Sequence, residues 1–347
     1  MDINFQELAA VAGVHFMGQP NVGFQVPGAR MRDTFNGMAC DAQPSLVTVS
    51  NAGIPAFLST YIDPKLIEVL VSPMKAAEIV GGEVRKGDWT TKTAMFPIVE
   101  STGEVSSYGD YSANGRAGVN ANFPQRQSYH YQVMTQWGEL ELETAGLARI
   151  DWANRLNIAS VLTLNKFQNR SYFFGVAGLQ NYGLLNSPNL SAPITPTTKV
   201  AGGTGWLNAT GNEVLADVTK LYTKLQTQAG GVIDRDTSMT LSISPISDSN
   251  GMTKVTEFNF SVQDKIKRLY PNLVIKTAPE YSMASGELIQ LIANDIQGQR
   301  TADTGFTEKL RAHPIVIAES SFRQKKSQGT WGTIIYRPFL IAQMLGV

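Results

Sequence analysis

The sequence has 347 residues, of which 43% are hydrophobic and only 17% are charged. This length suggests about two domains, and the apolar fraction is enough for a sizeable core. Lys plus Arg total 29 and Asp plus Glu total 29, so the chain as a whole is not an electrostatic binder of nucleic acid. The single cysteine, Cys40, excludes an intrachain disulfide and a cysteine metal cluster.

The chain carries no signal for secretion or membrane insertion. Residues 1–16 lack a basic region followed by an apolar run, which a signal peptide requires. A stretch of about eighteen apolar residues, the length that spans a bilayer, does not occur. We therefore expect the protein to be made and kept in the cytoplasm, without contact with a membrane.

Residues 1–60 are predicted to form an extended arm. Glycine or proline recurs every few residues, and no helical or strand period lasts long enough to build a core. Apolar side chains such as Phe16, Phe24 and Phe35 are nevertheless too frequent for a free disordered tail. An arm that lies on another surface satisfies both observations.

Two short helices and a long β-ribbon are predicted next. Asp63 and Pro64 begin one helix, and residues 73–80 form another that ends at two glycines. Residues 89–99 and 128–137 have strand patterns, separated by a long run rich in Gly, Ser, Tyr and Asn. An isolated two-stranded ribbon is marginal in water, so we expect this ribbon to lean on another surface.

Residues 139–170 are predicted to form one long helix without proline. At ~1.5 Å per residue it would be on the order of 40 Å long. Asp151 precedes Arg155 by one turn, the favourable order for a helical ion pair. The predicted apolar stripe consists of Ala145, Ala148, Trp152, Leu156, Ala159, Leu162 and Lys166. Alone, this pattern fits a core helix of an ordinary enzyme equally well.

The C-terminal half alternates helix and strand, which predicts a compact α/β domain of about 130 residues. The predicted helices cover residues 212–229 and 255–269, and the predicted strands cover 238–243, 273–277 and 288–293. Two long closing strands, 309–318 and 333–344, are predicted to be joined by a polar turn at 323–329.

Residues capable of chemistry do not converge on a catalytic, cofactor or metal site. His15, His130 and His313 lie in different segments without a ligand neighbour. Residues 202–205 (GGTG) lack the lysine of a phosphate loop and are predicted to be a flexible surface loop. Residues 248–251 (DSNG) resemble the start of a calcium loop but lack its last acidic ligand. The basic cluster Arg323, Lys325 and Lys326 fits either weak contact with DNA or a solvated turn.

The order of these parts resembles that of HK97-fold major capsid proteins of tailed bacteriophages. Residues 178–188 (GLQNYGLLNSP) resemble the glycine-rich start of that family's axial domain, and residues 336–339 (YRPF) resemble its final strand. The resemblance implies an α+β fold. Its parts would be an N-arm (1–60), a P-domain in three pieces (61–85, 132–174 with the spine helix, and 306–347), an E-loop ribbon (86–131) and an A-domain (175–305).

The resemblance implies a shell protein that assembles into pentamers and hexamers in the cytoplasm of a host bacterium and encloses double-stranded DNA in an icosahedral virion. Scaffolding, portal and decoration proteins are the expected further partners, with non-specific contact to DNA. The short helical start of the chain suggests that scaffolding is supplied by another protein or is not needed. The residues expected at contacts between subunits are Phe24, Trp89, Lys92, Tyr108, Tyr111, Arg116 and Arg126.

Some family members join subunits covalently, through a lysine near the tip of the ribbon and an asparagine of a neighbour. Here Lys92 is predicted on the first strand of the ribbon, and the tip carries Arg116 instead. We therefore expect no covalent crosslink.

Two alternatives remain at this point. An encapsulin-type compartment shares the fold but encloses enzyme cargo, and a soluble α/β enzyme would need a catalytic constellation that the sequence does not display. The long arm and ribbon favour the virus.

Overall fold

The computed structural model describes residues 73–347, except 148–149 and 257–258. The predicted arm with Phe24, the predicted helix at Asp63, and His15 and Cys40 therefore lie outside the described residues. The first described helix, α3 (Ala76–Val80), ends at Gly81 with a left-handed φ of 100°, as predicted from the glycine pair.

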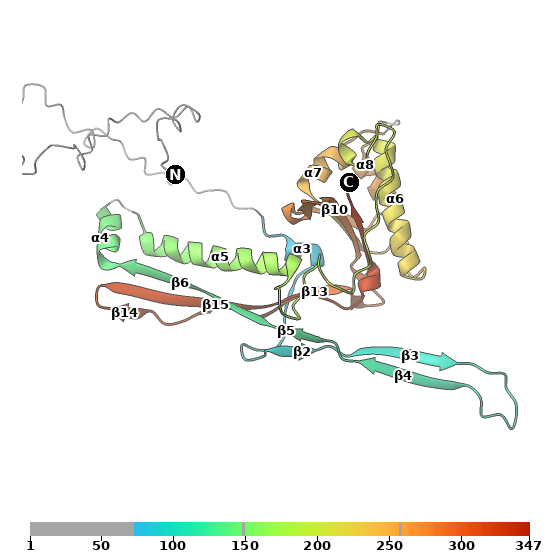
Figure 1. Cartoon of the computed structure of the whole chain (residues 1–347), viewed down its shortest axis with the longest axis horizontal. Helices are drawn as coiled ribbons and strands as arrows, with labels where there is room; N and C mark the ends of the chain where they lie inside the picture. Colours follow the sequence, from blue (N-terminus) through green and yellow to red (C-terminus); the bar gives the residue numbers. More distant parts are fainter. Residues whose placement is uncertain (1–72, 148–149, 257–258) are drawn as a thin grey trace, which may run out of the picture. The chain divides into compact units, whose positions relative to one another are not determined.

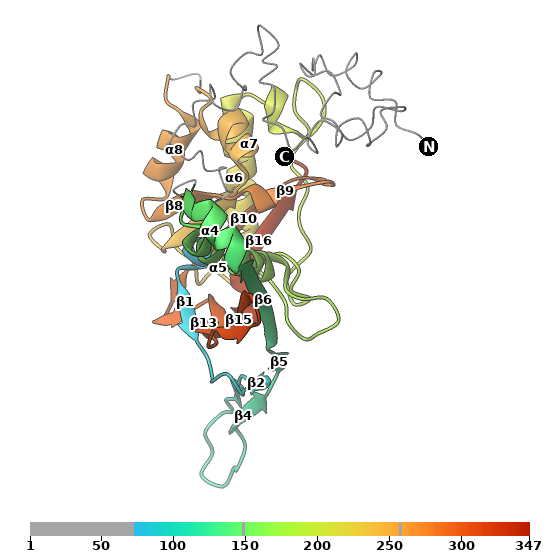
Figure 2. The same ribbon diagram turned by 90° about the vertical axis from the view of Figure 1, so that its left-hand side faces the viewer.

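A long helix lying on an antiparallel-rich sheet forms one part of the fold (Figures 1 and 2). In this sheet β1 pairs in parallel with β13, and β15 pairs with β13, β14 and β6, all antiparallel. The strands are β1 (Glu83–Arg85), β6 (Tyr129–Gly138), β13 (Ala302–Ala312), β14 (Val316–Ala318) and β15 (Ser321–Ile335). Helix α5 (Trp152–Phe174) packs on β15 and β6.

The single helix predicted over 139–170 is two helices. The first, α4 (Glu139–Leu147), buries none of its residues, and the second, α5, continues four residues beyond the predicted end. Asp151 lies outside the helix as the N-cap of α5, where its carboxylate accepts a hydrogen bond from the backbone N–H of Asn154 at 3.2 Å. The sequence reading missed this because an aspartate fits a helix surface and a helix cap equally well.

The predicted apolar stripe is also wrong, because α5 turns a mainly polar face toward the sheet. Trp152 is 40% exposed, and Ala159 and Lys166 are exposed. The buried residues of α5 are Ser160, Leu164, Gln168, Asn169, Ser171, Tyr172 and Phe173. The sequence also predicts that the stripe with Trp152 packs on residues 315–318 and 334–340 of the closing strands. Instead, the polar face of α5 packs on the middle of β15.

Hydrogen bonds hold α5 to this sheet. The Lys326 ammonium donates to Asn157 Oδ1 at 2.8 Å and to Ser160 Oγ at 2.7 Å. Gln328 Nε2 donates to Asn165 Oδ1 at 3.1 Å. The polar residues 323–329, predicted as a turn, therefore lie inside the longest described strand, and the chain reverses at 319–320 instead.

The ribbon is formed by different strands from those predicted. Strand β2 (Thr93–Met95) pairs with β5 (Gln125–Gln127), and β3 (Ile98–Glu104) pairs with β4 (Arg116–Asn122). Most of the run predicted to separate the strands is thus the ribbon itself. The predicted second strand, 128–137, is β6 and pairs with β15 over its whole length.

A second sheet has the order β16-β10-β7-β8, with β9 on β10. Its strands are β7 (Met239–Ile243), β8 (Leu273–Thr277), β9 (Ser282–Met283), β10 (Gly286–Ala293) and β16 (Ile341–Leu345). Helices α6 (Gly211–Gln228), α7 (Pro245–Ser247) and α8 (Val262–Leu269) belong to this part, and a small hairpin joins β11 (Asp295–Ile296) to β12 (Gln299–Arg300). The short helical turns are η2 (Trp206–Asn208), η3 (Asp248–Met252), η4 (Pro279–Tyr281) and η5 (Pro338–Leu340).

The predicted elements of this half are largely confirmed, with three corrections. The strand predicted over 309–318 is the end of β13 followed by the separate strand β14. The helix predicted over 255–269 begins only at Val262, where Ser261 caps it. The strand predicted over 333–344 is divided by η5, so that β16 leaves the first sheet and joins the second beside β10. A core of apolar side chains from α6, α8 and this sheet, including Leu221, Leu241 and Leu291, is fully buried. In the described chain, no helix is long and apolar enough to cross a membrane.

Candidate inter-subunit surfaces

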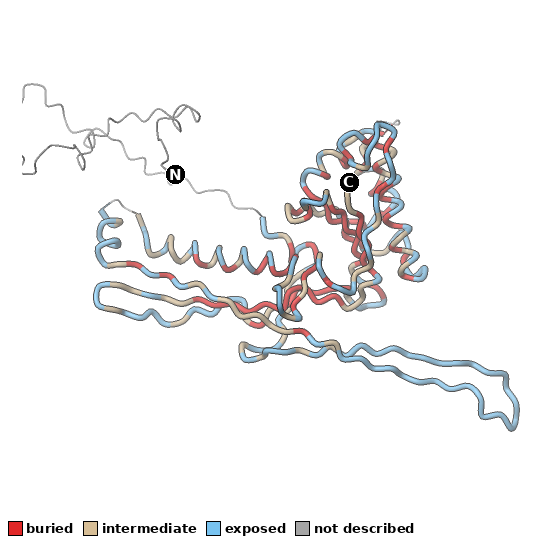
Figure 3. The backbone as a smooth tube through the Cα atoms, viewed as in Figure 1, coloured by how far each residue is buried: buried red, intermediate tan, exposed pale blue. Residues whose placement is uncertain are grey.

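The outer half of the ribbon has no cover from its own chain. Every residue of β3 and β4 is exposed, and Figure 3 shows this half of the ribbon as a continuous exposed segment. Val99, Val119 and Phe123 are among its large exposed apolar side chains. Soluble monomers rarely expose continuous apolar surfaces, so this part of the ribbon is a candidate contact with a partner.

The turn between β3 and β4, residues 105–115, carries two of the predicted contact residues. Tyr108 and Tyr111 are almost completely exposed. Arg116, a third, begins β4 directly opposite Glu104. Tyrosine and arginine are enriched at protein interfaces because each combines a large contact area with hydrogen-bonding groups.

At the root of the ribbon, Trp89 packs on its own chain. Its ring lies edge-on to the His130 ring, with centroids 4.5 Å apart, and the Arg311 guanidinium lies 5.3 Å from its ring centre. Burial lowers the pKa of His130 below its usual value. Lys92 is exposed and immediately precedes β2, so it is not on a strand as predicted.

Arg126 requires a correction. It is only 8% exposed, and its guanidinium lies 4.5 Å from the centre of the Tyr182 ring of the same chain. Burial lowers the pKa of this guanidinium. Arg126 therefore fastens the root of the ribbon to residues 178–188 and has little surface left for a neighbour.

A groove of about 990 Å³ lies beside this root. Apolar residues from distant parts of the sequence line it, including Phe96, Ile98, Ile335, Pro338 and Phe339. Phe96 and Tyr336 lie edge to face at 6.1 Å, with the Lys86 ammonium 5.3 Å from the Tyr336 ring centre. Sequence reasoning identified residues 336–339 only by resemblance, because the partners in this groove are more than two hundred positions away.

Two further exposed apolar surfaces were not predicted. Helix α4 exposes Leu140 and Leu147, and the short strand β14, with Ile315 before it, exposes Val316 and Ile317. The only signal in the sequence was the mixture of leucine and glutamate in residues 139–143. A strand with an apolar face and an unpaired edge favours association with another chain.

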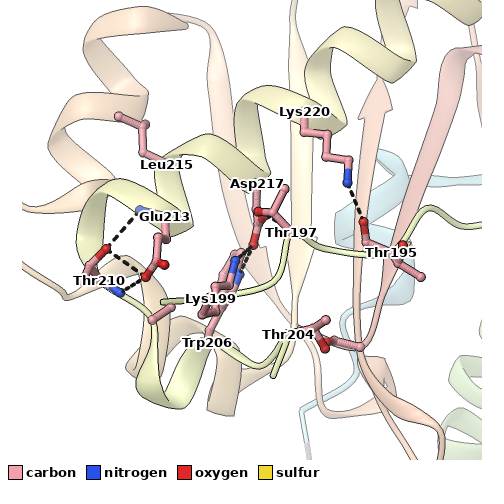
Figure 4. Close-up of polar contacts among 12 residues, drawn as sticks. Thr195, Thr197, Lys199, Thr204, Trp206, Thr210, Glu213, Leu215, Asp217 and Lys220 are labelled. Atoms are coloured by element: carbon pink, nitrogen blue, oxygen red, sulfur yellow. Dashed lines mark hydrogen bonds and ion pairs between the residues drawn. The ribbon is translucent and has the colours of Figure 1, made fainter. Parts of the chain in front are cut away.

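The loop between residues 195 and 206 is held by a buried carboxylate (Figure 4). Asp217 on α6 accepts hydrogen bonds from the backbone N–H of Thr197 at 3.0 Å and from Trp206 Nε1 at 3.0 Å. It also forms an ion pair with Lys199, and both side chains of this pair are completely buried. The segment 202–205, predicted to be a flexible loop, therefore lies between two anchored residues.

The described residues do not form a cluster suited to a metal ion. No group of three or more His, Cys, Asp or Glu side chains in residues 73–347, outside the two short gaps, is placed to hold a metal ion. Asp248 instead begins a short π-helical turn, and burial raises its pKa. Arg323 and Lys325 point to one face of β15, and Lys326 points to the other face, where it is buried under α5.

Comparison with known proteins identifies the family. A family model described as Pa193 gp26 major capsid protein matches residues 45–346. The chain belongs to this major capsid protein family. No curated protein matches the sequence.

Solved capsids share the fold of this capsid protein at low sequence identity. The capsid of Myoviridae phage XM1 superposes with a TM-score of 0.73 at 12% identity, covering 86% of this chain and 100% of that chain. The capsid of a native GTA particle has a TM-score of 0.59 at 9% identity, covering 86% and 98%. The capsid of cyanophage P-SCSP1u has a TM-score of 0.55 at 10% identity, covering 89% and 99%. The predicted α+β HK97-like fold is thereby confirmed.

Membership in this family settles the function at the level of the virion. The capsid protein is a structural component of the phage head shell, not an enzyme, and it assembles with copies of itself. The encapsulin and soluble-enzyme alternatives are therefore set aside.

Proposed function

We propose that this capsid protein forms pentamers and hexamers that close an icosahedral head around double-stranded DNA. The observation that supports this most strongly is the outer ribbon, whose fourteen strand residues, seven in β3 and seven in β4, are all exposed. A two-stranded ribbon of this kind is marginal in water unless a neighbour covers it. Assembly then stabilises the subunit, because a partner that binds only the folded chain favours folding.

In this proposal each segment has a mechanical role. The ribbon (86–131) and the arm (1–60, with Phe24) lap over adjacent subunits. The P-domain (61–85, 132–174 and 306–347) forms a stiff support through α5 and the first sheet. The A-domain (175–305), whose sheet β16 joins, packs around the local fivefold and sixfold axes. Tyr108, Tyr111, Arg116 and Lys92 supply polar and aromatic contacts; their exposure supports this role.

Trp89 is a weaker candidate for such a contact, because its ring already packs on His130 and Arg311. It would act mainly by fixing the direction of the ribbon.

Contact with the packaged DNA is proposed to be weak and independent of sequence. The chain has a formal net charge of zero, and one of its three clustered cations, Lys326, is buried. Without a concentrated positive surface, counterion release contributes little to binding. Scaffolding, portal and decoration proteins remain proposed partners.

The test is electron microscopy of the purified capsid protein beside a variant in which residues 98–122 are replaced by a two-residue Asn-Gly turn. This change keeps β2, β5 and the contacts of Trp89 and Arg126 at the root. The wild type should form closed shells with fivefold and sixfold capsomers, and the variant should stop at smaller oligomers. A wild type that forms only a uniform small oligomer under all conditions would contradict the proposal, and shells formed by the variant would contradict the role of the ribbon.

A further inference from the structure

We propose that the outer ribbon contacts a second copy of this chain through one face only, the face formed by Val99, Ser101, Gly103, Ala117, Val119 and Ala121. This inference rests on the proposed function, in which the ribbon lies on a neighbour, and adds which side is covered. We call this side the smooth face and the opposite side the charged face.

The strand register defines the two faces. In an antiparallel pair, residues directly opposite each other share a face, and successive residues alternate between faces. Val99 lies opposite Ala121, Ser101 opposite Val119, and Gly103 opposite Ala117. The charged face consists of the alternate pairs, Ile98 with Asn122, Glu100 with Asn120, Thr102 with Gly118 and Glu104 with Arg116.

The surroundings of two glycines agree with this assignment. A Cβ added to Gly103 would lie 3.8 Å from the Cβ of Ala117, on the smooth face. A Cβ added to Gly118 would lie 3.3 Å from Thr102 Oγ1, on the charged face. The alternation is therefore regular in the middle of the ribbon.

The two faces differ sharply in chemistry although both are exposed. All three charged residues of β3 and β4 (Glu100, Glu104 and Arg116) lie on the charged face. The smooth face has small or β-branched side chains and no charge, with Val99 and Val119 63% and 66% exposed. The one apolar residue of the charged face, Ile98, lies at the root and lines the groove described above.

A second copy is the occupant that fits the smooth face. The family membership places this chain in a shell made of copies of itself. An uncharged face is a poor match for DNA phosphates, because cations supply most of the affinity for them. A second copy does offer surfaces of matching chemistry, such as the exposed apolar residues Ile315, Val316 and Ile317. The charged face then remains toward solvent, where Glu104 and Arg116 keep the ribbon soluble before assembly.

The experiment compares neighbouring lysine substitutions on the two faces. V119K places a charge on the smooth face, and N120K places the same charge one residue later on the charged face. S101K and T102K repeat the comparison on β3, and S101K removes no apolar side chain. We expect the smooth-face variants to reduce shell yield about tenfold or more, since a lysine buried without a partner is costly. The charged-face variants should assemble within about twofold of wild type, since an exposed substitution changes little.

Equal thermal melting of the unassembled variants checks that each lysine leaves the subunit folded. Equal assembly within each pair, or stronger loss from N120K and T102K, would overturn the assignment of faces. The variant with residues 98–122 replaced shows whether a failed prediction concerns only the choice of face or the role of the ribbon itself. If it cannot form shells while V119K and S101K can, only the face is wrong; if it also forms shells, the proposed role of the ribbon is wrong.

Discussion

Replacement of Asp217 by asparagine (D217N) tests how the loop 195–206 is held. Asparagine keeps the shape of the side chain but removes its charge, so Lys199 would remain completely buried without a counter-ion. Breaking a buried ion pair from one side costs about 3–5 kcal/mol. For a protein of this size that corresponds to a fall in the melting temperature on the order of 10 °C.

The structure also predicts a rescue. In the double variant D217N/K199M the buried ammonium is removed as well. The Thr197 N–H and Trp206 Nε1 donate to different oxygens of Asp217, so the single amide oxygen of asparagine can accept from only one of them. Much of the lost stability should still return, because the uncompensated charge costs more than the one hydrogen bond that stays unmade.

Thermal unfolding of all variants in the same assembly state provides the measurement. E213Q is the matched control, because Glu213 is a half-buried carboxylate one turn earlier on the same helix. It accepts hydrogen bonds from the backbone N–H groups of Thr210 and Val200. Its loss should be much smaller than that of D217N. If D217N melts within a degree or two of wild type, or if K199M adds to the damage instead of relieving it, the ion pair does not hold the loop as described.

Three further predictions concern other parts of the chain. Purified shells should give a single band at 37.8 kDa on a denaturing gel, and a ladder above it would show that subunits are covalently linked after all. G332A should destabilise the protein more than G178A. Both glycines have a left-handed φ, which costs alanine about 1 kcal/mol, but at Gly332 the new Cβ would also lie 2.3 Å from the Tyr182 carbonyl oxygen. Equal unfolding temperatures of the two variants would refute this prediction. Burial lowers the pKa of Lys326 in the folded chain. Between this lowered pKa and the usual lysine pKa of about 10.4, the unfolded chain binds more protons than the folded chain, so the free energy of unfolding should rise with pH. In K326M the free energy of unfolding, measured from neutral pH to about pH 10, should rise less with pH than in the wild type. An unchanged slope would show that other groups cause the rise.

Much of the α/β half could be read from the sequence because its signals are local. Helix α6 begins at a capping box of Thr210 and Glu213, and its buried face follows the helical period through Val214, Val218, Leu221 and Leu225. Strand β8 has the predicted bounds. Such elements bury apolar side chains against an apolar sheet, so the hydrophobic pattern reports the structure directly.

The helix and sheet of the other half were misread for one physical reason. Helix α5 places Ser160, Asn165 and Ser171 in hydrogen bonds with Lys326, Gln328 and Thr330 of β15. A hydrogen-bonded interface of this kind has no apolar period, so the polar strand resembled a turn and the exposed stripe with Trp152 resembled a core. Each polar group is acceptable in the interior only because its partner, more than 150 residues away, is present.

The ribbon shows the same division. Its composition predicted that it would need support from another surface, and the order of arm, ribbon, helix and α/β domain indicated a capsid protein. The register of β3 and β4 decides which residues lie opposite each other. It therefore also decides that one side of the ribbon carries no charge. A shift of the register by one residue would move every side chain of a strand to the other face. The register is set by the pairing of the strands and by the contacts at the root of the ribbon, and a local sequence pattern does not contain this information.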